Sequence, residues 1–190
     1  MKRTPYREIL WLFIITRLLL VIVTYFGYIL FTAANYTSTP VNVAGLLTSW
    51  NHWDAANYVR IAQYGYQSRF DLAFFPLFPL MISLIAHVLG SWSYLLAGTL
   101  ISNGALLAAL FVIYQLAADV AGDEVAHRTL LYLCIFPTAL FFFAAYNESL
   151  FILLTAGAFL AMRRQRWWLV GILGFFAALT RAAGVLLVVP

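Results

Sequence analysis

The chain has 190 residues, of which 64% are hydrophobic and only 9% carry a charge. A soluble domain has about 45–50% apolar and about 25% charged residues, so this composition excludes an ordinary soluble globular protein. The net charge of +4 does not indicate nucleic-acid binding, because the basic residues lie beside apolar blocks and form no single basic face. Uncharged windows of roughly 18 to 25 residues can cross a bilayer as helices, and no strand-like alternation is present. We therefore predict an all-α polytopic membrane protein.

Six apolar blocks follow one another along the chain, at about 9–32, 72–90, 92–118, 128–146, 148–162 and 167–189. The first is longer than the core of a signal peptide, which has about 7–15 residues, so we predict that it is a retained span. If all six blocks cross the membrane, the basic cluster "RRQR" lies opposite the basic N-terminus. This breaks the tendency of short basic loops to stay on the inner side.

A five-span arrangement removes that conflict by making the block 72–90 a re-entrant or surface segment of an outer loop, 33–91. This block is the weakest span, because Pro76 and Pro79 each lack a backbone donor and His87 interrupts its end. We favour one transmembrane domain over 1–190 with spans at about 9–32, 92–118, 128–146, 148–162 and 167–189. Six spans remain the alternative. Only the five-span arrangement brings Asp54, Glu148 and Arg181 to the same outer side.

The segment "WNHWDAANYVRIAQYGY" interrupts the apolar pattern at residues 50–66. On a helix it would carry one broad face made of Trp50, Trp53, Asp54, Asn57, Ile61 and Tyr64. Aromatic rings stack on sugar rings, and carboxylate and amide groups bind hydroxyls, so this face would suit a sugar. The alternative is an interfacial helix with the usual membrane aromatics.

Two further charged residues lie beside or inside apolar blocks. Glu148, in "AAYNESLF", is either functional or simply a favourable charge at the start of a helix. Arg181, in "ALTRAAG", lies about 20 Å along the last block at 1.5 Å per residue. An arginine within a membrane is costly and suggests function, such as binding a lipid phosphate; the alternative is that it extends to the interface.

The sequence contains no recognisable metal-ligand pattern. Cys134 is the only cysteine, which rules out an internal disulfide and a cysteine-based metal site. His52 and His87 have no partners at ligand-like spacing. Asp54 could contribute to binding a divalent cation, and no other cofactor is expected.

Several motifs, in this order, resemble the PIG-V family of mannosyltransferases. The first is "HWDAANYVRIAQYGY" followed by "AFFPLFPLM", then "IFPTALFFFAAYNESLF", and last "RRQRWWLVGILGFFAALTRAAGVLLVVP". The similarity runs with gaps from about residue 50 to the end. That family belongs to the GT-C superfamily of polyprenyl-phosphate-sugar-dependent glycosyltransferases.

The resemblance implies a GT-C-like helical bundle whose outer loop carries surface helices. It also implies a mannose donor on dolichyl or another polyprenyl phosphate, with Asp54 as the first-loop catalytic carboxylate and Glu148 as a second outer acid. Two features depart from the family: Asn147 stands where Thr or another small polar residue is common, and family members are longer. We therefore expect the chain to be the N-terminal part of a longer enzyme.

We predict inverting transfer of mannose to a glycan or glycolipid acceptor at the outer membrane face. Asp54 would act as general base and Glu148 would bind the acceptor or support Asp54. The predicted substrate-binding residues are Arg181, which would stabilise the leaving phosphate, Trp53, Asn57, Tyr58 and Arg60. The alternatives are a transporter or lipid-carrier translocase, and an inactive fragment of the enzyme. A bacterial source would place the protein in the plasma membrane, and a eukaryotic source in the endoplasmic reticulum, in GPI-anchor biosynthesis.

Overall fold

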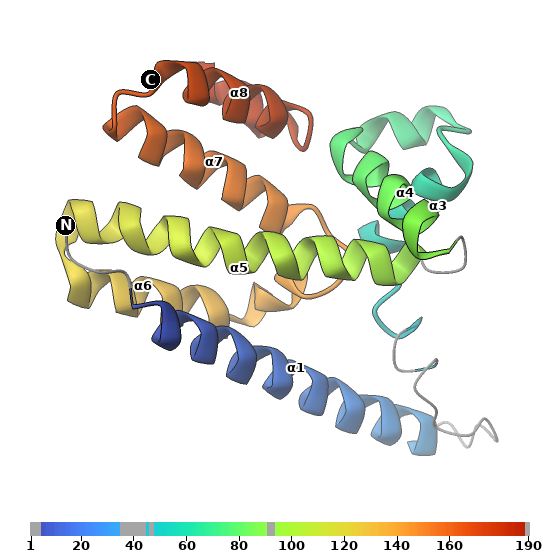
Figure 1. The fold of residues 1–190 in the computed structure, drawn as a ribbon. Helices are drawn as coiled ribbons and strands as arrows, with labels where there is room; N and C mark the ends of the chain where they lie inside the picture. The colour runs from blue at the N-terminus through green and yellow to red at the C-terminus, as the bar shows by residue number, and fades with distance from the viewer. Residues whose placement is uncertain (1–4, 35–44, 46–47, 91–93, 189–190) are drawn as a thin grey trace.

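A computed structural model describes residues 5–34, 45, 48–90 and 94–188, and every regular element among them is helical. The prediction of an all-α fold is confirmed for this part of the chain. Residues 35–44, 46–47 and 91 of the predicted outer loop, and 92–93 of the predicted span that follows, lie outside the described residues. The helices form a layered bundle, with a smaller pair of helices at one end (Figure 1).

Two helices are long and apolar enough to cross a membrane. Helix α1 covers Tyr6–Ala34 and helix α5 covers Tyr94–Ala121, which correspond to the predicted blocks 9–32 and 92–118. At 1.5 Å per residue each helix exceeds the ~30 Å of a hydrocarbon core. Helix α1 packs on one side only, so large apolar side chains such as Val23 remain exposed.

Helix α5 lies at the centre of the bundle. It packs against α6, which covers Asp123–Ile135, and against α7, which covers Glu148–Arg163 (Figure 1). Leu106 and Leu110 of α5 are fully buried together with Leu130 of α6. Because small and branched apolar side chains fill this interface, α5 provides a rigid support for the segments that lead into α7.

The apolar block 128–146 contains a break at Pro137. Helix α6 ends at Ile135, and Phe136 is extended because the proline ring disfavours helical geometry in the residue before it. A 3-10 helix, η2, then covers Pro137–Phe142. Side chains of α5 bind the segment that follows: Ser102 Oγ donates to the carbonyl of Tyr146 at 2.7 Å, and Asn103 Nδ2 donates to that of Phe143 at 2.8 Å. These bonds fix the start of α7.

The last apolar block, 167–189, turns back on itself. Helix α8 covers Trp167–Ala178 and packs on α7, and the 3-10 helix η3 covers Ala182–Val188. Gly184 of η3 lies directly against the backbone of Ala177, where an added Cβ would come within 2.3 Å of the carbonyl carbon. Glycine is therefore required for η3 to return along α8. Arg181 lies at this turn and not in the middle of a helix.

Helices α3 and α4 form the smaller pair at one end of the bundle (Figure 1). Helix α3 covers Asp54–Tyr64, the 3-10 helix η1 covers Arg69–Ala73, and α4 covers Leu77–Leu89. Pro76 and Pro79 fall at the start of α4, where a missing N–H breaks no helical hydrogen bond. Helix α4 contacts both α3 and α5.

The basic cluster predicted to lie inside is found at the other end of α7. Arg163 donates to the carbonyl of Asp119 at 3.1 Å, and Arg164 donates to Gln115 Oε1 at 2.6 Å. Both partners belong to the C-terminal part of α5. The starts of α3 and α7 and the end of α8 therefore share one end of the bundle, and the arginine cluster lies at the opposite end (Figure 1).

Candidate functional site

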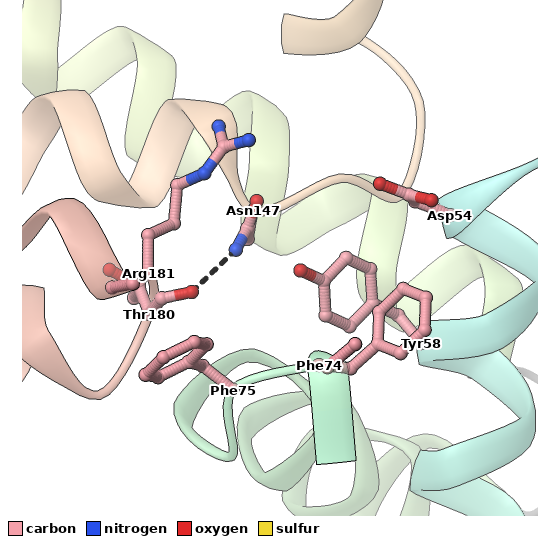
Figure 2. Close-up of a pocket in the computed structure, with 9 residues that line it drawn as sticks. Asp54, Tyr58, Phe74, Phe75, Asn147, Thr180 and Arg181 are labelled. Carbon is pink, nitrogen blue, oxygen red and sulfur yellow. Dashed lines mark hydrogen bonds between the residues drawn. The ribbon is translucent and has the colours of Figure 1, made fainter. Parts of the chain in front are cut away.

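A cavity of about 360 Å³ lies where three parts of the chain meet. Its lining comes from the start of α3, the loop before α4, and the adjoining ends of α7 and α8: Asp54, Tyr58, Ala73, Phe74, Phe75, Asn147, Thr180, Arg181 and Ala182 (Figure 2). The volume falls within the range of about 300–1,000 Å³ that is usual for small-ligand sites. One carboxylate and one guanidinium face a largely aromatic and polar surface.

Asp54 is the first residue of α3 and is solvent-exposed. The helix dipole favours a negative charge at this position. Its carboxylate accepts no hydrogen bond and forms no ion pair within the part of the chain that the structure describes. It is therefore free to accept a proton from a bound hydroxyl.

Tyr58 lies one turn after Asp54 and is buried, with its ring packed edge-on against Phe74 and Phe78. Burial raises the pKa of the Tyr58 phenol well above its usual value, and the nearby carboxylates of Glu148 and Asp54 raise it further. The phenol therefore stays protonated and can donate a hydrogen bond into the cavity (Figure 2).

Arg181 lines the cavity and pairs with Glu148. Its Nη1 lies 3.1 Å from Glu148 Oε1, and its guanidinium carbon lies 6.0 Å from the centre of the Phe151 ring. Glu148 begins α7 and lies behind the lining, with its second oxygen, Oε2, buried without a hydrogen-bond partner. Arg181 thus keeps part of its donor capacity for a ligand, because one Nη bond leaves most of its five N–H groups unused.

Asn147 joins the start of α7, which carries Glu148, to the turn after α8, which carries Arg181. Its Nδ2 donates to the carbonyl of Thr180 at 2.7 Å, within the cavity wall (Figure 2). The amide of Leu77 donates to the carbonyl of Leu179 at 3.0 Å and ties α4 to the same turn. In the sequence alone, Asn147 stands out only as a departure from a family pattern, because its partner lies 33 residues away and no local signal links them.

The prediction of one sugar-binding face on a helix is wrong in its extent. Helix α3 begins only at Asp54, so Trp50 and Trp53 precede it. Trp50 is buried against Phe143, and Trp53 has a positive φ of 50° and is 72% exposed. The buried face of α3 carries instead Ala55, Tyr58, Ile61 and Ala62.

Of the predicted substrate-binding residues, Tyr58 and Arg181 line the cavity, whereas Trp53, Asn57 and Arg60 do not. Asn57 Nδ2 donates to the carbonyl of Trp53 at 3.3 Å. Arg60 is bound by Asp71, with its Nη2 2.6 Å from Oδ1 and its Nη1 3.3 Å from Oδ2. Their proposed contact with substrate stays a prediction.

Asp71 is a functional candidate that sequence analysis missed. Its side chain is fully buried and also accepts the backbone N–H groups of Gln67 and Ser68, at 2.8 and 3.0 Å. The Arg60 guanidinium and these N–H groups hold the pKa of the Asp71 carboxyl well below its usual range. This cluster fixes the loop that carries Phe74 and Phe75 into the cavity. Asp71 is the third residue of η1, and its spacing from Ser68 is that of a capping box, which is the local signal that could have pointed to it.

Asp71→Asn is expected to lower the melting temperature of the detergent-purified protein at pH 7, on the order of 5 °C. The lowered pKa means that the carboxylate stabilises the fold above the unfolded pKa of about 3.9, and that this contribution is lost as pH falls through the lower, folded value. The difference between variant and wild type should therefore shrink in acid. Glu124→Gln, at the opposite end of the bundle, is the control; equal melting temperatures for Asp71→Asn and wild type at pH 7 would contradict this role.

The structure describes no group of three or more His, Cys, Asp or Glu side chains that could together bind a metal ion. Asp54 is the only acidic residue among the described residues that line the cavity. A divalent cation beside Asp54 would therefore take most of its ligands from substrate phosphate and water, as Mg²⁺ often does. It stays a prediction.

Comparison with known proteins connects this chain to one family. The family model described as "Mannosyltransferase (PIG-V)" matches residues 7–189. GPI alpha-1,6-mannosyltransferase 2 of Mus musculus is 36% identical over 152 residues, which cover 75% of this chain and 31% of that protein. The Homo sapiens protein of the same name is 34% identical over the same shares, and that of Cricetulus griseus is 33% identical over 80% of this chain and 33% of its own length. The chain thus spans about a third of the length of these relatives. No solved structure matches it.

Proposed function

This chain belongs to the PIG-V mannosyltransferase family, and from that premise we propose that it transfers mannose from a dolichyl or polyprenyl phosphate to a glycan or glycolipid. The reaction takes place at the exoplasmic face of the membrane. The observation that supports this most strongly is the meeting of Asp54 and Arg181 in one cavity, although 127 positions separate them. A proton acceptor and a fixed cation are the two groups that this transfer needs.

In the proposed reaction, Asp54 takes the proton from an acceptor hydroxyl as that oxygen attacks the anomeric carbon of mannose. A bond forms between the acceptor oxygen and this carbon, and the bond between the carbon and the phosphate oxygen breaks. The electron pair stays on the leaving phosphate. Attack opposite the leaving group inverts the anomeric centre.

Arg181 stabilises the charge that grows on the leaving lipid phosphate. Its guanidinium is already held in place by Glu148, so it needs no reorganisation as this charge develops. Glu148 orients Arg181 through their 3.1 Å contact. Its other oxygen, Oε2, is buried behind the cavity lining, so the contact with acceptor hydroxyls expected from the sequence stays a prediction. Tyr58 donates a hydrogen bond from its phenol to the sugar. The rings of Phe74 and Phe75 form an apolar wall for the C–H face of the sugar ring.

The membrane orientation rests on charge. The arginines at 163, 164 and 166 are exposed at the end of the bundle away from the cavity, and short basic loops favour the inner side. The cavity end then faces outward. The membrane is that of the endoplasmic reticulum in a eukaryote and the plasma membrane in a bacterium. The names of the similar proteins make a GPI-anchor precursor one acceptor of the proposed class.

A transporter or lipid-carrier translocase is the second candidate. Such a protein binds its substrate near the middle of the bilayer, usually on interrupted helices. The described cavity that contains both a carboxylate and a guanidinium lies instead at one end of the bundle, which favours chemistry at the surface.

A transfer assay tests this function. Membranes containing the longest form of the gene product are expected to move labelled mannose from polyprenyl-phosphate-mannose to a lipid or glycan fraction. The same membranes given labelled nucleoside-diphosphate mannose, with synthesis of the polyprenyl carrier blocked, should transfer none, because the proposed cavity takes a lipid monophosphate. Equal transfer from the nucleotide sugar would contradict the donor class, and no transfer from either donor would favour the non-enzymatic alternatives.

A further inference from the structure

A second cavity, of about 350 Å³, lies between helices α5, α7 and α8 and includes residues of the basic cluster. Its wall is almost entirely apolar and includes Val112, Leu153, Leu160, Leu169 and Leu173. Arg164 and Arg166 complete it at one end. This second cavity, called the groove below, shares no lining residue with the first cavity and contains no residue proposed to act in transfer.

Small residues keep the groove open. Gly157 of α7 lies so close to α8 that an added Cβ would come within 3.2 Å of Leu173 Cδ1. Ala161, one turn later, is also part of the wall. Larger side chains at these positions would push into the space or force α8 away from α7.

The two arginines give the groove a charged mouth. Arg164 uses one N–H to reach Gln115 Oε1 at 2.6 Å, which holds the guanidinium in place and leaves other donors unused. Arg166 immediately precedes α8 and is exposed. Asp119, which follows Gln115 by one turn of α5, carries a carboxylate, but it does not line the groove. An anion at the mouth would therefore meet two cations and no acidic wall residue.

The neighbouring aromatic residues indicate where this mouth lies in a bilayer. Trp167 and Trp168 directly follow Arg166 and are 57% and 68% exposed. Tryptophan side chains gather at the level of lipid head groups, because the ring is apolar and its N–H is polar. The groove therefore runs from head-group depth toward the hydrocarbon region.

We propose that this groove binds an anionic phospholipid. The phosphate lies between Arg164 and Arg166, and one acyl chain lies against the leucines of α7 and α8. Basic pockets between transmembrane helices on the inner side bind anionic head groups in this way. A neutral lipid would fill the apolar wall equally well but would leave the two guanidinium groups without an anionic partner.

Native mass spectrometry of the full chain, purified in detergent, tests this with phosphatidylglycerol and phosphatidylcholine of identical acyl chains. Wild type is expected to retain phosphatidylglycerol preferentially. The double variant Arg164→Gln/Arg166→Gln should bind it about 30-fold more weakly, because each basic residue near a lipid surface contributes roughly a fivefold effect. Phosphatidylcholine binding should not change. Arg128→Gln, an exposed arginine of α6 at the same end that pairs with Glu124, is the matched control and should match wild type.

Val112→Trp, which fills the groove from the α5 side, should weaken binding of both lipids while leaving the arginines intact. Equal retention of the two lipids by wild type would overturn the proposal. So would binding of glycerol phosphate as tight as that of the lipid, because the apolar wall would then contribute nothing. A dimer that Val112→Trp disrupts, with no lipid adduct in wild type, would identify a second copy of the chain as the occupant and also overturn it.

Discussion

Asp54→Asn is expected to lower the rate of mannosyl transfer by about 10²–10⁴-fold, the usual contribution of a general base. Asparagine has nearly the same shape, and its side chain cannot accept the proton of the acceptor hydroxyl. Asp54 is exposed at the edge of the cavity and is bound by no other described side chain, so the substitution leaves no buried partner unpaired. The loss should therefore appear in turnover and not in folding.

The measurement is the initial rate of transfer from labelled polyprenyl-phosphate-mannose, normalised to the amount of protein in the membrane. Asp119→Asn removes an exposed carboxylate from the opposite end of the bundle and should behave as wild type. If Asp54→Asn retained wild-type turnover, Asp54 would not be the base. A variant that failed to insert into the membrane would be recognised by its loss from the membrane fraction.

Arg181→Gln is expected to lower kcat/KM for the lipid-phosphate donor by about 10²–10³-fold, the effect of removing one group that stabilises charge in a transition state. Glutamine keeps part of the hydrogen bonding but lacks the positive charge. Two explanations would fit such a loss. Arg181 either acts on the leaving phosphate or only neutralises Glu148, whose Oε1 lies 3.1 Å away.

The double variant Glu148→Gln/Arg181→Gln separates these explanations. If Arg181 only compensates the partly buried carboxylate, removing both charges should restore transfer, because no charge is left unpaired. If Arg181 stabilises the phosphate, the double variant should remain as slow as Arg181→Gln alone. Recovery of the double variant to the rate of Glu148→Gln would remove Arg181 from the proposed mechanism.

Composition and charge predicted the general architecture because they depend on physical properties averaged over many residues. An apolar content of 64% indicated helices in a membrane, and α1 and α5 are long and apolar enough to span one. The distribution of arginines predicted that Asp54, Glu148 and Arg181 share one side. The structure brings Asp54 and Arg181 to the same cavity with Glu148 beside it.

Local geometry was predicted less well, because single residues interrupt regular patterns. Pro137 ends the helical part of the block 128–146, and the turn at Arg181 divides the block 167–189. Placed on a continuous helix, Arg181 would lie about 20 Å along the last block. Because α8 ends at Ala178 and the chain turns before η3, the Arg181 guanidinium points toward Glu148 and lines the cavity.

By itself, the sequence determined the helical class of this protein and its family motifs, and it singled out Asp54 as a candidate, because each of these depends on composition or on residues close together in the chain. Only the tertiary structure decided which side chains act together. The Asn147–Thr180 bond and the Arg60–Asp71 pair join residues 33 and 11 positions apart. A helix brings into contact only side chains three or four positions apart, so only the packing of α3, α4, α7 and α8 brings these residues within hydrogen-bonding distance.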